Sequence, residues 1–401
     1  MNNFTSEKYD VVVVGGGPAG ATAATDLARQ GHKVMLLDRD GRIKPCGGAI
    51  PPILIEEFCI PDSLLVAKVN SARIVSPTNH EVDMPIDGGY VAMVDRDEYD
   101  EWLRQRASNA GAERITGQFR RLENISADLV NVTYRDKQGE EFTVETRFVI
   151  GADGARSEVG RQSIEGAESV PYVAAYHEIV SSPENFNSQQ IKFDPARCDI
   201  YYDGKYSPDF YAWVFPHGKC TSIGVGSANK GFSLRAAVSE LRKLTGMENN
   251  ETIRKEGAPI PLKAISRWDN GKNIILAGDA AGVVAPASGE GIYYAMHSGR
   301  LVAEAVDMAI ETNNAKALKT ARKKFMKNHG RVFWMLGIMQ KFWYANDKRR
   351  ERFVSMCDDP DVQYLTWQAY MHKRLVKAKP AAHARIFLKD MAHLLGIVSP
   401  Q

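Results

Sequence analysis

Two short apolar runs near the start of the chain flank a stretch with helical spacing. Residues 9–14 and 33–37 are rich in β-branched and other apolar side chains, as buried strands are. Residues 21–30 have the pattern of a helix, and Gly31 follows as a stop signal. This order of strand, turn, helix and strand within about 30 residues predicts the opening of a doubly wound nucleotide-binding domain.

Period-two alternation dominates the middle of the chain. Residues 95–111 form an amphipathic helix, after which 128–135 and 141–150 alternate like a hairpin around Gly139. We expect further strands, forming an antiparallel sheet in a second unit, at residues 71–77, 81–85, 172–180, 189–193, 199–202, 210–215 and 221–227. A buried strand at 273–277 precedes a mostly helical remainder, from 285–312 onward, with breaks near Pro360 and Pro380.

Composition excludes several classes of protein. Apolar residues make up 44% of the 401 positions and charged residues 25%, so the chain can bury a core and is not intrinsically disordered. Five cysteines without a C-x-x-C pair exclude a disulfide scaffold and favour a reducing compartment. The histidines show no metal-binding spacing, so we expect no metal. The polar N-terminus is no signal peptide, and no apolar run is long enough to span a membrane.

Charge is distributed unevenly along the chain. The net charge is +2, but residues 313–401 carry 18 Lys and Arg against 6 Asp and Glu, together with eleven aromatic residues. Such a segment can dock on anionic lipid. The alternative is an ordinary solvated helical cap with a buried aromatic seam. Nucleic-acid binding is a further use of a basic patch, and we do not expect it here.

A glycine-rich turn carries the clearest chemical signal. In Gly15-x-Gly17-x-x-Gly20, the first glycine permits the tight turn, the second lets a pyrophosphate approach the backbone, and the third lets the helix pack on the sheet. Asp38, at the end of the second strand, can accept hydrogen bonds from a ribose. The dinucleotide-binding residues predicted here are Gly15, Gly17, Ala19, Gly20, Asp38 and Arg39.

Two later segments narrow the choice of dinucleotide. Asp153 lies in Gly151-Ala152-Asp153-Gly154, and Asp279 lies in Gly278-Asp279-Ala280-Ala281-Gly282, each after a predicted strand. Asp279 can hold a ribityl hydroxyl, and the helix start at Gly289-Glu290-Gly291-Ile292 can stabilise negative charge on a reduced flavin. With the glycine turn, this order resembles the flavoprotein family of aromatic hydroxylases and geranylgeranyl reductases, which implies FAD. By that resemblance the cofactor-binding residues include Arg96, Asp153, Asp279, Gly289, Gly291 and Ile292.

Two narrower signatures divide this family. One signature is Lys44-Pro45-Cys46-Gly47-Gly48, and the other is Tyr211-x-Trp213-x-Phe215-Pro216. Both resemble signatures of the geranylgeranyl reductases. Over the whole length of the chain, the resemblance is to the branch of this family that acts on chlorophylls. The resemblance implies that Cys46, Gly47 and Gly48 lie beside the flavin, and that the catalytic residues are Cys46, Tyr211 and Trp213. Alternatively, Cys46 is a small buried residue, and the aromatic residues are core.

The resemblance implies an α/β fold with three parts. A Rossmann-type FAD-binding domain of the aromatic hydroxylase/geranylgeranyl reductase type takes residues 1–70, 95–168 and 268–312. An antiparallel-sheet substrate domain takes 71–94 and 169–267, and a basic, aromatic helical region takes 313–401. The resemblance implies NADPH as the electron donor, with a ferredoxin-like donor, as in archaeal relatives, as the alternative. Because the chain has one Gly-x-Gly-x-x-Gly, we expect a pyridine nucleotide to bind only transiently.

The implied activity is the reduction of isolated C=C bonds of a geranylgeranyl chain to phytyl. The substrate is geranylgeranyl-(bacterio)chlorophyll or geranylgeranyl diphosphate, and the reaction combines hydride from flavin N5 with protonation. The implied location is the bacterial cytoplasm, peripheral on the photosynthetic membrane, with pigment-synthesis proteins as partners. The alternatives are a reductase of archaeal-lipid or quinone prenyl chains, an FAD-dependent aromatic hydroxylase, and a non-catalytic prenyl carrier.

Overall fold

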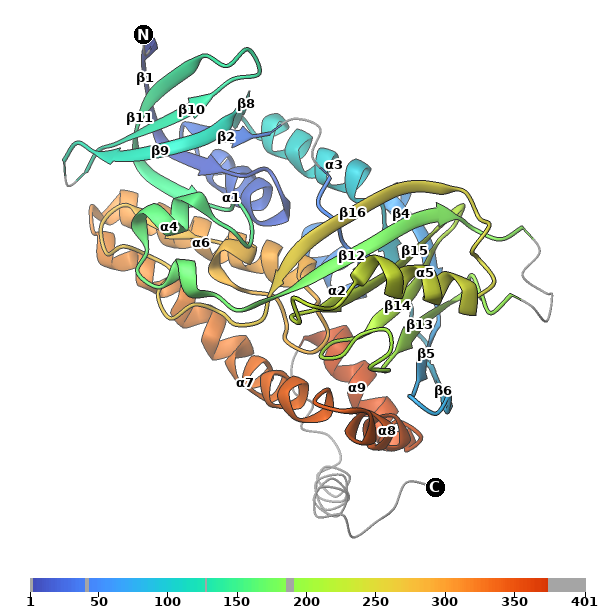
Figure 1. Ribbon diagram of the computed structural model, residues 1–401. Coiled ribbons are helices and arrows are strands. Elements are labelled where there is room, and N and C mark those ends of the chain that lie inside the picture. The colour runs from blue at the N-terminus through green and yellow to red at the C-terminus, as the bar shows by residue number, and fades with distance from the viewer. Residues whose placement is uncertain (1–2, 40–42, 127, 185–190, 374–401) are drawn as a thin grey trace. The chain divides into compact units, whose positions relative to one another are not determined.

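The computed structural model describes residues 3–39, 43–126, 128–184 and 191–373. Figure 1 labels most of the helices and strands named below. They form two compact units. Unit 1 holds the described residues within 1–44, 96–172 and 259–333, and unit 2 holds those within 45–95, 173–258 and 334–401.

Unit 1 is built on a mixed sheet in the order β8-β2-β1-β11-β10-β9, with β17 beside β11. The parallel core strands are β1 (Asn3–Val14), β2 (Val34–Asp38), β8 (Glu113–Thr116), β11 (Glu141–Gly151) and β17 (Ile274–Leu276). β9 (Gln118–Asn124) and β10 (Val130–Arg135) add an antiparallel extension. The buried positions 11–14 and 34–37 explain why β1 and β2 lie at the centre of the sheet.

Helices with small residues pack closely in unit 1. α1 (Pro18–Arg29) packs against α6 (Ile292–Thr312) and α3 (Arg96–Asn109). Gly299 permits the close approach of α6 to α1, since a Cβ there would lie 2.3 Å from the Ala19 carbonyl oxygen. The helix predicted over 285–312 begins only at Ile292 because Ala287 and Gly289 both adopt a φ of 65°. α4 (Glu158–Ser163) completes this set.

Unit 2 contains a seven-stranded sheet in the order β16-β12-β15-β14-β13-β5-β6. Its strands are β5 (Ser71–Val75), β6 (Glu81–Pro85), β12 (Tyr172–Ser181), β13 (Arg197–Tyr201), β14 (Ala212–His217), β15 (Cys220–Ser227) and β16 (Thr252–Pro261). The expected antiparallel order holds from β12 to β13, but β13 and β5 pair in parallel. α5 (Leu234–Leu244) covers one face through Ala237, Val238 and Leu241.

A small second sheet and the described helical residues from Trp334 onward also belong to unit 2. The order β3-β7-β4 joins Ala49–Ile50, Val91–Val94 and Leu65–Val69, and α2 spans Pro52–Phe58. These pairings group residues 45–70 with unit 2, whereas the sequence placed them with the nucleotide-binding domain. Farther along the chain are α7 (Lys319–Trp343), α8 (Asp347–Met356) and α9 (Pro360–His372).

Two further differences concern the predicted elements. Residues 313–333 group with unit 1, where Phe325 packs against Trp268 with ring centroids 5.2 Å apart. Residues 191–193 form no strand, and the rest of the strand predicted over 189–193 lies outside the described residues, as does the predicted break near Pro380.

Candidate active site

The glycine turn between β1 and α1 has the shape that a dinucleotide needs. A Cβ on Gly15 (φ 106°) would lie 2.4 Å from the Ala152 carbonyl oxygen, and one on Gly20 would lie 1.9 Å from the Gly15 carbonyl oxygen. The fold therefore requires both as glycine. A Cβ on Gly17 would meet nothing within 4 Å, and its φ of −75° suits any residue. The open space beside Gly17, at the start of α1, fits an approaching pyrophosphate.

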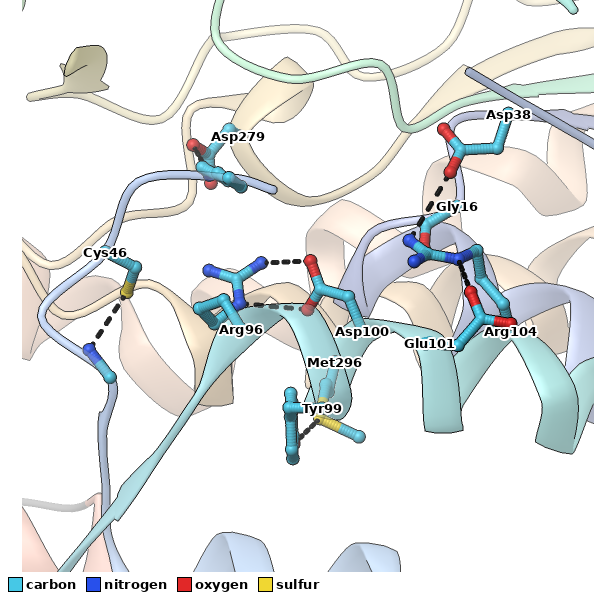
Figure 2. A network of polar contacts seen from close by, with 12 residues as sticks. Gly16, Asp38, Cys46, Arg96, Tyr99, Asp100, Glu101, Arg104, Asp279 and Met296 are labelled. Atoms are coloured by element: carbon cyan, nitrogen blue, oxygen red, sulfur yellow. Dashed lines mark hydrogen bonds and ion pairs between the residues drawn. The ribbon is translucent and has the colours of Figure 1, made fainter. Parts of the chain in front are cut away.

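Asp38 lies at the end of β2 beside an arginine that sequence reasoning missed. Arg104 on α3 places Nη1 3.4 Å from Asp38 Oδ2 and 3.4 Å from the Gly16 carbonyl oxygen, as Figure 2 shows. Burial raises the pKa of the Asp38 carboxyl. Arg104 thus links the predicted ribose acceptor to the phosphate turn. Its signal in the sequence is only that it lies two helical turns after Arg96. Arg39 follows β2 and is exposed.

Arg96 begins α3 in a buried ion pair. Its Nε and Nη2 atoms lie 2.9 and 2.7 Å from the two carboxylate oxygens of Asp100, one turn along the helix (Figure 2). In the same turn the Tyr99 hydroxyl lies 3.0 Å from Met296 Sδ on α6. This bidentate pair holds the guanidinium rigidly at the helix start. The predicted contact of Arg96 with the flavin stays a prediction.

The two acidic residues of the later FAD segments have different surroundings. Asp153 accepts hydrogen bonds from Ser157 Oγ and from the backbone N–H groups of Glu158 (2.7 Å) and Val159 (3.1 Å), so it caps α4. Asp279 lies in the turn after β17 and forms an ion pair with Lys44, the first residue of the cysteine signature. Asp279 is buried, and Asp153 is half-buried.

The start of α6 lies beside Asp279. Gly291 is the N-cap residue, and a Cβ there would lie 3.8 Å from Asp279 Oδ1. Gly289 turns the chain with a φ of 65°, and Ile292 is buried at the first helical position. The turn after β17 and the N-terminus of α6 therefore come together, as a ribityl and flavin-ring site requires.

The aromatic signature lies on one face of the large sheet of unit 2. Trp213 and Phe215 share a face of β14, whereas Ala212 and Val214 point into the core beneath α5. Tyr211 precedes the strand, and its ring centroid lies 5.9 Å from that of Trp213. On the neighbouring strand, a Cβ on Gly224 would lie only 2.2 Å from the indole ring of Trp213. Gly224 on β15 therefore leaves the space that the Trp213 indole occupies.

The cysteine loop packs against this aromatic face. A Cβ on Gly47 would lie 3.0 Å from the Phe215 ring, and one on Gly48 (φ 72°) would lie 2.6 Å from His217 Nε2. The backbone N–H of Gly48 lies 3.5 Å from the sulfur of Cys46, which is a free, half-buried thiol (Figure 2). Burial lowers the pKa of His217 to about 4. Two signatures far apart in the sequence therefore lie side by side.

Within the part of the chain that the structure describes, no group of three or more His, Cys, Asp or Glu residues is arranged to hold a metal ion. Over the same described ranges, no helix combines the length and apolar character needed to cross a membrane.

The parallel sheet, the glycine turn and the acidic residue at the end of β2 define a dinucleotide-binding oxidoreductase fold. A family model described as lycopene cyclase protein matches residues 10–391. The chain is 57% identical over 395 residues to the geranylgeranyl diphosphate reductase of Rhodobacter capsulatus, covering 98% of this chain and 99% of the relative. The chain belongs to the geranylgeranyl reductase family.

Two further comparisons concern a more distant relative and a solved structure. It is 29% identical to the digeranylgeranylglycerophospholipid reductase of Methanocaldococcus jannaschii, over 81% of this chain and 84% of the relative. Its fold matches a crystal structure described as geranylgeranyl bacteriochlorophyll reductase-like, from Thermoplasma acidophilum, with a TM-score of 0.80 and 23% identity, over 95% and 100% of the two chains. The predicted α/β fold class is confirmed.

Proposed function

We propose that this protein is an FAD-dependent reductase of the isolated C=C bonds of a geranylgeranyl chain. The observation that carries the proposal is the packing of the Cys46-Gly47-Gly48 loop against the aromatic face of β14. The relatives favour this substrate chain over an archaeal lipid. The chain is 57% identical to the bacterial geranylgeranyl diphosphate reductase and 29% identical to the archaeal phospholipid reductase.

Residues of unit 1 fit the cofactor. Gly17 leaves open space that would admit the pyrophosphate. Asp38 at the end of β2 would accept from a ribose, and Asp279 with the α6 N-terminus would hold the ribityl and ring portion. FAD, when bound, supplies the hydride. Arg96 at the start of α3 is a further proposed contact. The open turn at Gly17 is the direct structural support for a bound dinucleotide.

The aromatic residues suit the charge that alkene reduction develops. An isolated alkene has no carbonyl to accept negative charge, so protonation must accompany hydride transfer, and the tertiary carbon takes cationic character. The faces of Tyr211 and Trp213 attract such a charge, an effect of about 0.5–2 kcal/mol. Cys46, in a loop of small residues beside Phe215, is the proposed residue nearest the flavin. We assign the catalytic roles to Cys46, Tyr211 and Trp213.

The proposal also specifies the electron donor and the molecule that carries the geranylgeranyl chain. We propose NADPH as the donor, as the family resemblance implies. The sequence contains a single glycine turn of this type, which we assign to FAD. The donor therefore binds only for the transfer. The chain to be reduced is carried by (bacterio)chlorophyll or by a diphosphate.

The apolar substrate suggests contact with a membrane surface. On α7, Trp334 is 71% exposed, and Met335 and Ile338 are also exposed. Lys341 is exposed at the position that continues this face of the helix. Such an apolar patch with a basic neighbour is typical of an interfacial helix on anionic lipid. Flotation with anionic vesicles should recover the protein, and Trp334→Ala with Ile338→Ala should reduce recovery. No flotation of the wild type at low salt would contradict this docking.

The activity is tested anaerobically with the purified holoenzyme. NADPH or dithionite and geranylgeranyl bacteriochlorophyll in detergent are incubated with it, and the pigment is analysed by mass spectrometry. The proposal predicts successive gains of two hydrogen atoms per reduced bond. Parallel reactions contain geranylgeranyl diphosphate, a geranylgeranylated archaeal phospholipid, or a phenol with oxygen. Reduction of the phospholipid alone, or oxygen-dependent NADPH oxidation with the phenol, would refute the proposal in favour of those alternatives.

A further inference from the structure

A chain of polar contacts crosses four neighbouring strands beneath the aromatic signature. Trp213 Nε1 donates to Ser222 Oγ at 3.1 Å, and Ser222 Oγ lies 2.9 Å from His177 Nδ1. His177 Nε2 lies 3.0 Å from Glu256 Oε2, and Arg254 Nε lies 3.0 Å from the other oxygen of that carboxylate. The chain runs from β14 through β15 and β12 to β16, entirely within unit 2.

The sheet register explains why these side chains meet. Trp213 and His177 both pair with Gly224, from opposite sides of β15, so the two rings flank a position that has no side chain. Ser222 lies two residues before Gly224, on the same face. A Cβ on Gly224 would lie 2.6 Å from the His177 Cβ as well as 2.2 Å from the indole. The glycine therefore makes room for both rings.

Donor and acceptor chemistry assigns each proton in this chain. The indole nitrogen can only donate, so Ser222 Oγ accepts from Trp213. The Glu256 carboxylate can only accept, so His177 Nε2 carries a proton and donates it to Glu256. In the neutral imidazole that has its proton on Nε2, Nδ1 then accepts from the Ser222 hydroxyl. Glu256 thus fixes the tautomer of His177, and His177 fixes the orientation of the Ser222 hydroxyl. This hydroxyl in turn holds the N–H edge of the Trp213 indole. His177 and Ser222 are buried, and Trp213 is 5% exposed.

We propose that His177 and Ser222 are positioning residues for the reaction, which set the orientation of the Trp213 ring toward the substrate alkene. The inference rests on the proposed function, because it concerns the ring to which a catalytic role was assigned. A tilted indole presents less of its negative face to a developing cation. Loss of the contacts from Ser222 and His177 should therefore change kcat more than KM.

A double-mutant cycle tests the coupling. Ser222→Ala should lower kcat about 10-fold with little change in KM, whereas Ser222→Thr, which keeps the hydroxyl, should restore most of the rate. In a Trp213→Phe background, which has no indole N–H, Ser222→Ala should change kcat by less than about twofold. Ser182→Ala is the matched control, since it removes a 2.9 Å hydrogen bond to Thr221, the residue before Ser222, whose side chain takes the other face of β15. An equal loss in both backgrounds would overturn the proposal.

Two substitutions of the histidine separate its two contacts. The amide of an asparagine at this position would reach the place of Nδ1, and that of a glutamine, one carbon longer, would reach the place of Nε2. We therefore compare His177→Asn with His177→Gln. The first keeps the contact with Ser222 and should retain several-fold more kcat than the second. The reverse order would contradict the assignment of Ser222 as the link to Trp213.

A spectroscopic readout keeps this inference separate from the proposed function. The difference ultraviolet resonance Raman spectrum between wild type and Trp213→Phe reports the hydrogen bond of that indole. Ser222→Ala should shift the N–H-sensitive band toward a weaker hydrogen bond, and Ser182→Ala should leave it unchanged. If the wild type reduces no geranylgeranyl substrate, the proposed function fails while the band still decides whether the network exists. An unchanged band in Ser222→Ala would refute the network itself.

Discussion

Replacing Gly17 by alanine should separate the requirements of the fold from those of the cofactor. The residue has a φ of −75° and a ψ of −175°, which alanine adopts without strain. An added Cβ would meet no atom within 4 Å. We therefore expect the free energy of unfolding of the FAD-free protein to change by no more than about 0.5 kcal/mol.

The same methyl group should weaken FAD binding, because it fills the space proposed for the pyrophosphate. Forcing a methyl into a packed contact costs about 1–3 kcal/mol. Since about 1.4 kcal/mol corresponds to a tenfold change in affinity, the Kd for FAD should rise roughly 5- to 150-fold. Titration of deflavinated protein with FAD, followed by flavin fluorescence or calorimetry, measures this change directly.

Two other glycines serve as controls. Gly20→Ala would bring its Cβ to 1.9 Å from the Gly15 carbonyl oxygen, so it should destabilise the FAD-free protein itself. Gly231→Ala has only Asn229 Oδ1, at 3.5 Å, near its Cβ, and it should alter neither stability nor affinity. The reasoning is refuted if Gly17→Ala binds FAD as tightly as wild type, or if it loses as much stability as Gly20→Ala.

Three further predictions concern other parts of the candidate site. Cys46→Ala should retain bound FAD yet lose at least about tenfold in turnover, measured by flavin absorbance and pigment mass spectrometry; wild-type turnover would exclude a catalytic role. Arg104→Ala removes the contacts with Asp38 and the Gly16 carbonyl and should raise the Kd for FAD up to about tenfold; an unchanged Kd would make Arg104 purely structural. Burial lowers the pKa of His217 to about 4, below its value near 6.5 in an unfolded chain, so the unfolded state gains protons first and stability falls as the pH drops from about 6.5 toward 4. His217→Gln should reduce the loss of unfolding free energy between pH 7 and 5 by about 2 kcal/mol, measured by urea unfolding; an unchanged pH dependence would show that His217 contributes nothing to it.

The local pattern of the sequence determined the opening of unit 1 and the chemical class of the protein. The strand at 9–14, the helix after it and the acidic residue at 38 follow from apolar periodicity and glycine placement, which act over a few residues. Gly15 and Gly20 were identified for the same reason, because their requirement for glycine arises within the turn itself. The predicted helix at 95–111 likewise corresponds to α3, Arg96–Asn109.

Three features of the structure did not follow from the apolar pattern and the motifs. The helix expected from 285 starts at Ile292, because positive φ angles at Ala287 and Gly289 turn the chain first. The parallel pairing of β13 with β5 joins segments far apart in the sequence, and alternation alone does not distinguish parallel from antiparallel neighbours. Asp153 was predicted as a cofactor ligand from its segment, whereas only the coordinates show that its carboxylate caps α4.

The tertiary structure alone decided which chemical groups meet. The sequence identified the cysteine loop and the aromatic strand separately, and folding brought Gly47 against Phe215. The contacts of Trp213 through Ser222 to His177 depend on the register of three strands, which packing of the whole sheet sets. A periodic pattern states which face a side chain takes, but not which residue of another strand lies opposite. Motifs therefore indicated the chemistry, and strand register determined the neighbours that hold it in place.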